Sequence, residues 1–178
     1  MMPLGTKAPD FTLTDTISGS PLSLAKMKSD KATVIMFICN HCPYVIHLNE
    51  CMVALAKRYQ SKGVSFIAIS SNDVGTVPED GPELMKLHAE ECGYTFPYLY
   101  DEKQEVALAY DAACTPDFYV FDGELKLAYR GRLDNSRPGN AIQPTGKDLS
   151  DALDAILAGQ QVSSAQYPSM GCNIKWRE

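Results

Sequence analysis

The chain has 178 residues, 45% of them hydrophobic and 21% charged, with a formal net charge of −6 at pH 7. This length suits one domain with a full hydrophobic core, and the acidic balance argues against nucleic acid or an anionic membrane surface as a partner. The apolar runs are too short to span a bilayer. The segment Met1–Lys7 lacks the apolar stretch and cleavage-site pattern of a signal peptide, so we expect a cytoplasmic protein.

The first half of the chain alternates predicted strands with predicted helices. Residues 10–14 alternate polar and apolar side chains, as a half-buried strand does, and residues 22–28 form a short helical segment after a turn. Residues 33–38 are a continuous apolar run, which is typical of a central strand covered on both faces. From Pro43, apolar side chains recur at helical spacing until Gly63 ends the helix.

The second half continues this alternation. Residues 64–70 are predicted to form a strand parallel to 33–38, because a helix connects the two. The other predicted elements are a helix from Pro82 to about Cys92, a strand over 96–100, a helix over 102–110, hairpin strands over 118–121 and 125–130, and a helix over 148–158. This order predicts an α/β three-layer sandwich with a central mixed sheet. We expect a single domain over residues 1–178, with 159–178 a C-terminal tail packed on the body.

The most informative motif lies where the central strand gives way to the first long helix. It reads Cys39-Asn40-His41-Cys42-Pro43, and a proline suits the first helical turn because it has no amide hydrogen. A sulfur at this junction lies near unpaired N–H groups and the positive end of the helix, which favours a nucleophilic thiolate. The alternative is a small buried side chain at a helix start. All six cysteines are expected to be catalytic, metal-binding or buried rather than a disulfide framework.

Two further motifs give the chain a family resemblance. The segment Gly5–Leu13 resembles the start of the redoxin branch of the thioredoxin fold, which peroxiredoxins (AhpC/TSA) and TlpA-like proteins share. Thr115-Pro116, just before a predicted strand, is similar to the cis-proline dipeptide of the thioredoxin family. The resemblance covers roughly residues 4 to 158. It implies a thioredoxin-like domain and a thiol–disulfide oxidoreductase.

Aligning the central strands implies a role for each cysteine of the motif. With Phe37 on the phenylalanine that precedes the thioredoxin active site, Cys42 falls on the nucleophilic cysteine and Val45 on the resolving one. The same register places Cys42-Pro43 on the peroxiredoxin Cys-Pro pair. Cys39 then falls on the threonine whose hydroxyl touches the peroxidatic sulfur, which makes Cys39 the expected resolving thiol.

The resemblance also has two departures. Met36 stands where thioredoxins have a buried aspartate that assists proton transfer, and Pro116 stands where peroxiredoxins have an arginine that stabilises the transition state. A site without the peroxiredoxin threonine and arginine should be a poor peroxidase. This favours thiol–disulfide chemistry.

The remaining candidates surround this motif. His41 is expected either to favour the Cys42 thiolate and shuttle its proton or to be an exposed spacer. The resemblance implies a cis Thr115–Pro116 bond that presents backbone to substrate. Cys114 and Cys172 are alternative resolving thiols. Arg130 and Arg132 are expected either to flank the site or to lie at a solvated hairpin edge. The expected substrate-binding residues are Pro43, Thr115 and Pro116.

The sequence therefore predicts a cytoplasmic thiol–disulfide oxidoreductase with a Cys39/Cys42 redox pair, an accessible Cys42 sulfur and His41 beside it. Its partners are a protein or small-molecule disulfide and an external dithiol. One alternative is an antioxidant thiol peroxidase in which Cys42 is the peroxidatic cysteine. A second is a copper- or zinc-binding redoxin, with Cys39, His41, Cys42 and His47 as possible ligands. A third is a redox-inactive interaction domain. We expect no organic cofactor, because no phosphate-binding glycine motif is present.

Overall fold

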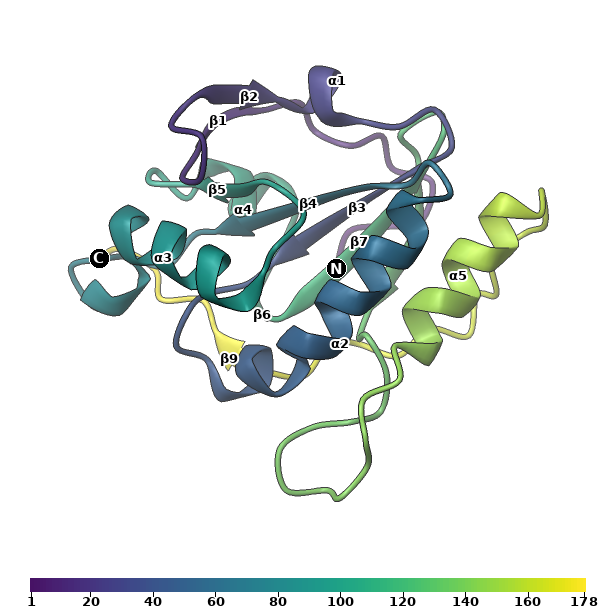
Figure 1. Cartoon of the computed structure of the whole chain (residues 1–178). Helices are drawn as coiled ribbons and strands as arrows, with labels where there is room; N and C mark the ends of the chain where they lie inside the picture. Colours follow the sequence, from purple (N-terminus) through teal and green to yellow (C-terminus); the bar gives the residue numbers. More distant parts are fainter.

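A computed structural model describes all residues, 1–178, and shows a central seven-stranded mixed sheet (Figure 1). The sheet order is β2-β1-β5-β4-β3-β7-β8. β3 is parallel to β4, as predicted, and antiparallel to β7. The strands are β1 (Thr12–Asp15), β2 (Pro21–Ser23), β3 (Ala32–Phe37), β4 (Ser65–Ser70), β5 (Tyr98–Tyr100), β7 (Asp117–Asp122) and β8 (Leu127–Gly131).

Helices cover both faces of the sheet. Side chains of β3 alternate between two buried clusters, with Val34 and Met36 in one and Ile35 and Phe37 in the other. α2, α3 and α5 pack on the first cluster, and α1 and α4 on the second. The helices are α1 (Leu24–Met27), α2 (Pro43–Gln60), α3 (Pro82–Cys92), α4 (Glu105–Ala109) and α5 (Lys147–Leu157), with a 3₁₀ turn over Pro78–Asp80. The three-layer α/β sandwich predicted from the sequence is confirmed.

One predicted element is wrong in part. The helical segment expected over 22–28 begins as β2, because Leu22 pairs with Leu13 of β1 across a short antiparallel hairpin. Only the one-turn helix α1 follows, and the Ser23 hydroxyl caps it by accepting from the Lys26 amide. The hairpin offers Leu22 a ladder of hydrogen bonds that so short a helix cannot match.

A second, two-stranded sheet lies at one end of the molecule. β6 (Cys114–Thr115) pairs antiparallel with β9 (Cys172–Asn173), which belongs to the C-terminal segment. In Figure 1 this segment runs from α5 beneath the start of α2 to the side of α3. The pairing therefore brings the chain's last residues to the end of the sheet from which α2 emerges.

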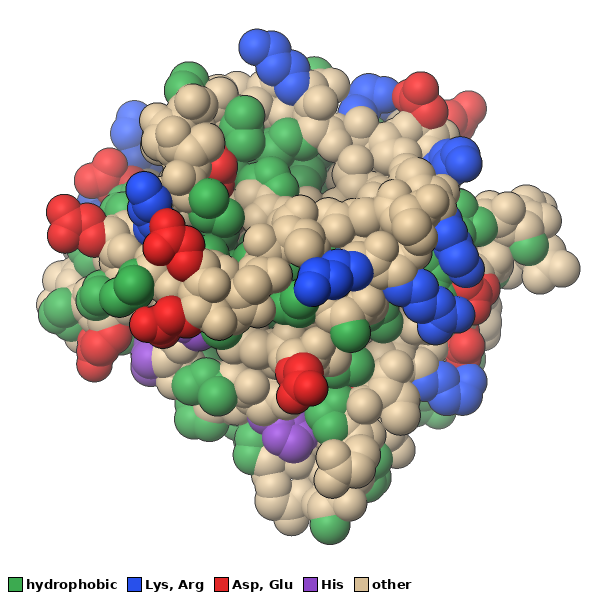
Figure 2. Space-filling model, in the orientation of Figure 1, with side chains coloured by type: hydrophobic (Ala, Val, Ile, Leu, Met, Phe, Trp, Pro, Cys, Tyr) green, Lys and Arg blue, Asp and Glu red, His purple; other side chains and the backbone are tan.

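The surface is mixed in charge. Figure 2 shows acidic and basic side chains on the same face, with hydrophobic side chains between them in small groups. None of the helices is long and apolar enough to cross a membrane.

Candidate active site

Cys42 is the residue that caps the N-terminus of α2. It has extended backbone angles, and Pro43 occupies the first helical turn. The first amide groups of an 18-residue helix have no partner within the helix, so the region around the Cys42 sulfur is electropositive. The strand-to-helix junction predicted from the sequence is thus present.

Three groups surround the Cys42 sulfur. The Cys172 Sγ lies 2.9 Å away, and the Thr115 carbonyl oxygen lies 3.4 Å away. The Cys39 thiol, within the same motif, lies close enough to Cys42 to lower its pKa, and it approaches the Thr115 hydroxyl at 3.6 Å. The structure therefore brings Cys39, Cys42 and Cys172 together, with Thr115 against two of them.

These contacts shift the pKa values of Cys39 and Cys42 in opposite directions. The interaction with the Cys39 thiol is the largest influence that lowers the pKa of Cys42, to about 4, and hydrogen bonding to Cys172 and to the Thr115 side chain lowers it further against the opposing effect of burial. The same interaction between Cys39 and Cys42, then burial and the charge of Asp80, raise the pKa of Cys39 far above that of a free thiol. This arrangement favours the thiolate form of Cys42 and the protonated form of Cys39.

The expectation of an accessible Cys42 is wrong for this conformation. Cys42 is 0% exposed, as is Cys39, whereas Cys172 is partly exposed. The cause is the C-terminal segment, which places Cys172 against the sulfur while β9 pairs beside it with Thr115. The thiolate is at the mouth of the helix, but the chain's own tail covers it.

The Thr115–Pro116 peptide bond is cis, as the resemblance implies. Pro116 lines a small pocket beside the start of α2, together with Tyr44, Arg137 and Met170. The pocket lies next to the three thiols, because Thr115 contacts both Cys39 and Cys42. Of the predicted substrate-binding residues, Thr115 touches the sulfur and Pro116 faces the adjoining pocket.

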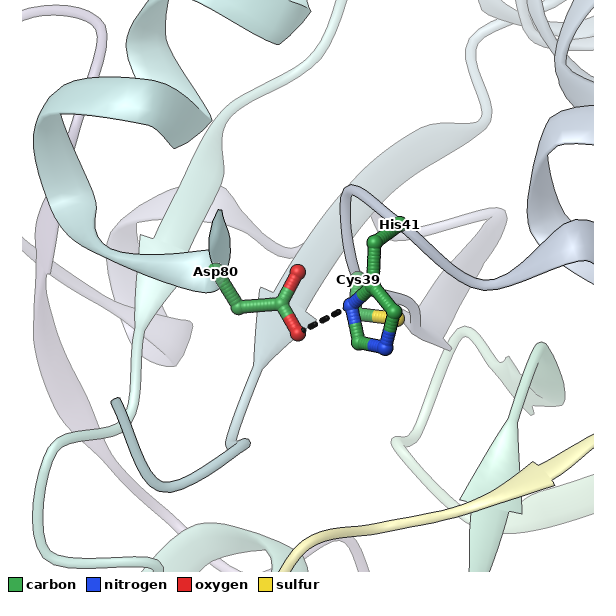
Figure 3. Close-up of side chains that lie close together, drawn as sticks. All are labelled: Cys39, His41 and Asp80. Atoms are coloured by element: carbon green, nitrogen blue, oxygen red, sulfur yellow. Dashed lines mark ion pairs between the residues drawn. The ribbon is translucent and has the colours of Figure 1, made fainter. Parts of the chain in front are cut away.

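His41 is held by a buried carboxylate that the sequence analysis missed. Its Nδ1 lies 2.6 Å from Asp80 Oδ2 (Figure 3), and the Asp80 side chain is fully buried. Asp80 also accepts from the Asn40 amide and from Asn72 Nδ2, each at 2.8 Å. His41 is thus an oriented group and not a free spacer.

The remaining candidates divide between the site and the scaffold. Burial raises the pKa of Cys114 to about 12, and the Cys42 sulfur contacts Cys172 rather than Cys114. Burial, then the contact with Cys42, raises the pKa of Cys172 to about 11. Arg130 is buried on Asp117, 3.3 Å away, so the predicted solvated hairpin edge is wrong for this residue. Its guanidinium thus contacts the first residue of β7, directly after Pro116.

The fold and the clustered thiols define an oxidoreductase of the thioredoxin fold. The sequence matches the AhpC/TSA family over residues 4–130, and the chain belongs to that family. It is 28% identical over 147 residues to the thiol-disulfide oxidoreductase ResA of Geobacillus kaustophilus, covering 79% of each protein.

Two solved structures are very similar along the whole chain. An uncharacterized conserved protein from Geobacillus kaustophilus is 61% identical with a TM-score of 0.98, covering 99% of this chain and 94% of that one. A hypothetical protein from Sinorhizobium meliloti 1021 is 45% identical with a TM-score of 0.96, covering 99% and 96%. A secreted disulfide oxidoreductase of Mycobacterium tuberculosis, at 18% identity and a TM-score of 0.61 over 82% and 95% of the chains, shares the fold.

Proposed function

We propose that this protein is a thiol–disulfide oxidoreductase in which Cys42 is the attacking thiolate. The observation that carries the proposal is the Cys42 sulfur itself, which caps a long helix, has a lowered pKa and lies against two other thiols. A thiolate is the form that attacks disulfides, and a dithiol is needed to release the product. The similarity to ResA supports the same chemistry.

The proposed reaction transfers two electrons from the protein to a substrate disulfide. The Cys42 thiolate attacks one substrate sulfur, the substrate S–S bond breaks, and the first substrate thiolate leaves and takes a proton from solvent. A second protein thiol then attacks Cys42, forms a protein disulfide and expels the second substrate thiolate, which receives that thiol's proton. An external dithiol restores the reduced protein.

Two thiols are available for the second step. Cys39, predicted from the sequence as the partner of Cys42, interacts with it from within the same motif. Cys172 contacts it from the C-terminal segment. His41, whose ring is fixed by Asp80, is proposed to hold the loop between Cys39 and Cys42 in place. We place the reaction in the cytoplasm, where the six thiols, all unpaired in this structure, remain reduced.

Thiol peroxidase activity is the second candidate, supported by the family and by the Cys42-Pro43 pair. Two arginines of this region, Arg130 and Arg132, are paired with carboxylates, whereas Arg137 lines the pocket beside Pro116. Arg130 pairs with Asp117, and Arg132 pairs with Asp148 at 2.6 Å. Neither Arg130 nor Arg132 is therefore free to stabilise a peroxide at Cys42, and Pro116 stands where the peroxiredoxin resemblance implies an arginine, which favours disulfides as substrates.

Metal binding is the third candidate. Ligand atoms of Cys39, His41 and Asp80 lie within 4.8 Å of one another (Figure 3). Asp80 already accepts from the Asn40 amide and from Asn72, and it lies 2.6 Å from His41 Nδ1, so a metal would have to replace the His41 contact. The arrangement fits a carboxylate that orients a histidine better than one that binds a cation.

Turnover measurements with the full-length protein test the proposal. With oxidised glutathione as substrate and dithiothreitol as reductant, the wild type is expected to be active and Cys42→Ser to fall to the uncatalysed rate. Equal activity of the two proteins would refute the proposal. Faster turnover of hydrogen peroxide than of disulfide would favour the peroxidase, and stoichiometric zinc or copper in the reduced protein would favour the metal site.

A further inference from the structure

The C-terminal strap, defined as Gln166–Arg177, crosses the mouth of the site and is fastened on both sides of it. On the β8 side, the Gln166 amide group donates to the Ala128 carbonyl and accepts from the Arg130 amide. The Tyr167 carbonyl then accepts from the Arg132 amide at 3.2 Å. These contacts use edge groups of β8, so the strap continues the sheet's hydrogen bonding toward Cys42.

At the site itself, the strap fits only because residue 171 is glycine. A Cβ placed on Gly171 would lie 1.8 Å from the Thr115 carbonyl oxygen and 3.2 Å from Pro116 Cδ. The next residue, Cys172, pairs with Thr115 in the β6–β9 ladder. The ladder and the close approach together direct the Cys172 side chain toward the Cys42 sulfur, 2.9 Å away.

Beyond the site, the strap is joined to the network that holds His41. Ile174 is buried in the core cluster beneath α4. The Lys175 amide donates to Asn72 Oδ1 at 2.8 Å, and Asn72 Nδ2 donates to Asp80, the partner of His41. The Asn72 side chain therefore contacts the strap through its oxygen and the Asp80 carboxylate through its nitrogen.

We propose that Cys172 is the thiol that closes the catalytic cycle, and that the strap is a displaceable strand that presents it to Cys42. This inference rests on the proposed function. A disulfide bond is ~2.05 Å long, so the 2.9 Å contact becomes a bond after a movement of about 0.9 Å. Substrate reaches Cys42 when the strap moves aside, and the returning strap resolves the mixed disulfide.

The surroundings of the two competing thiols favour Cys172 over Cys39. Cys39 is completely buried, and its interaction with Cys42 is the largest influence that lowers the pKa of Cys42. Cys39 must therefore stay protonated to keep Cys42 ionised. Cys172 is partly exposed and belongs to a segment held by separate contacts on each side of the site. Cys39 is therefore assigned to activation of the thiolate and Cys172 to its resolution.

The Cys172 sulfur attacks the Cys42 sulfur of the mixed disulfide, the Cys42–substrate bond breaks, and the Cys42–Cys172 bond forms. The substrate leaves as a thiolate and takes the proton that Cys172 releases. Two electrons pass from the two cysteines to the substrate disulfide, which becomes two thiols.

Peptide mapping of the oxidised full-length protein decides between the partners. Trypsin leaves Cys39 and Cys42 together in the peptide Ala32–Lys57, while Cys172 lies in Asp148–Lys175. After oxidation by a small excess of oxidised glutathione, we expect the two peptides to be linked in the wild type and in Cys39→Ser. In Cys172→Ser, glutathione should remain on Ala32–Lys57 about a hundredfold longer, since a tethered thiol acts at ~mM effective concentration.

Each other result has a distinct meaning. An internal bond in Ala32–Lys57, with oxidised Cys172→Ser losing its glutathione at the wild-type rate, would overturn the role of Cys172 and leave the proposed function intact. If neither adduct nor bond forms at Cys42, and Cys42→Ser consumes oxidised glutathione as fast as the wild type, the proposed function fails and the inference with it. Cys51→Ser is the matched control within Ala32–Lys57 and should behave as the wild type.

Discussion

The hydrogen bond from Cys39 to Cys42 gives the sharpest quantitative prediction. It is the largest influence lowering the pKa of Cys42 to about 4, and Cys39→Ala removes the donor. A hydrogen bond to a charged group contributes ~1.5–3 kcal/mol, which at 1.36 kcal/mol per pKa unit is a rise of about 1–2 units. The pKa of Cys42 should therefore rise to about 5–6 in the variant.

The ultraviolet absorbance of the thiolate, corrected by the same titration of Cys42→Ser, measures this shift in the reduced protein. At pH 5 the ionised fraction of Cys42 should fall from about nine-tenths to between about one-half and one-tenth. Cys39→Ser is the matched control, because a hydroxyl at the same place still donates and should preserve the low pKa. Identical titration midpoints for Cys39→Ala and the wild type would refute the assignment of Cys39 as the activating donor.

Three further predictions concern Asp80, Gly171 and the Cys42 thiolate. Asp80→Asn should lower the free energy of unfolding, measured in urea, by about 2–3 kcal/mol, because the amide leaves buried donors without their acceptor. Asp151→Asn, at an exposed ion pair, should change it little. Equal losses in the two variants would contradict the buried network. Gly171→Ala should speed alkylation of Cys42 about 5- to 150-fold, since the added methyl costs the docked strap ~1–3 kcal/mol. Gly159→Ala meets no neighbouring atom, and its backbone strain, at a φ of 69°, lies outside the strap, so it should leave the rate within about twofold of the wild type. A wild-type rate for Gly171→Ala would show that the strap does not limit access. The pKa of Cys42 is lowered on folding, so its thiolate contributes stability that is present in full above the unfolded pKa of ~8.5 and is lost as pH falls toward about 4. The difference in unfolding free energy between the wild type and Cys42→Ser should shrink over this range, and a difference independent of pH would argue against a folded-state thiolate.

The order of strands and helices could be predicted because its signals are local. β3 is a continuous apolar run, and α2 begins at a proline and keeps helical spacing to its end. The same local signals predicted the strand-to-helix junction that carries Cys42. A segment such as β2 was assigned wrongly, because three residues at a hairpin carry no period of their own.

The contact between Cys42 and Cys172 could not be predicted from such patterns. It joins residues 130 positions apart, and the tail that carries Cys172 has neither helical nor strand periodicity. Its place is decided by unpaired edge groups of β6 and β8 and by the space that Gly171 leaves. The covered state of Cys42 depends on the same contacts, which is why the sequence predicted an accessible sulfur.

The sequence carries a signal that places Asn72 near the CxxC motif, but it carries none for Asp80. The parallel strands β3 and β4 end at the same edge of the sheet, so a polar residue just after β4 is expected near the motif that follows β3. Asn72 occupies that place, two residues beyond Ser70. Asp80 follows a loop and a 3₁₀ turn, and only the folded chain shows that its carboxylate returns to His41.

The unequal pKa values of the two thiols determine how a Cys42–Cys172 disulfide is reduced. An external thiolate that attacks Cys172 expels Cys42, with a pKa of about 4, whereas attack on Cys42 expels Cys172, with a pKa of about 11. The thiol of lower pKa leaves faster, and Cys172 is also the more exposed sulfur. A monothiol added to the oxidised protein and quenched early with acid should therefore be found on Asp148–Lys175. An adduct on Ala32–Lys57 would show that reduction begins at Cys42 and that the strap opens before it is attacked.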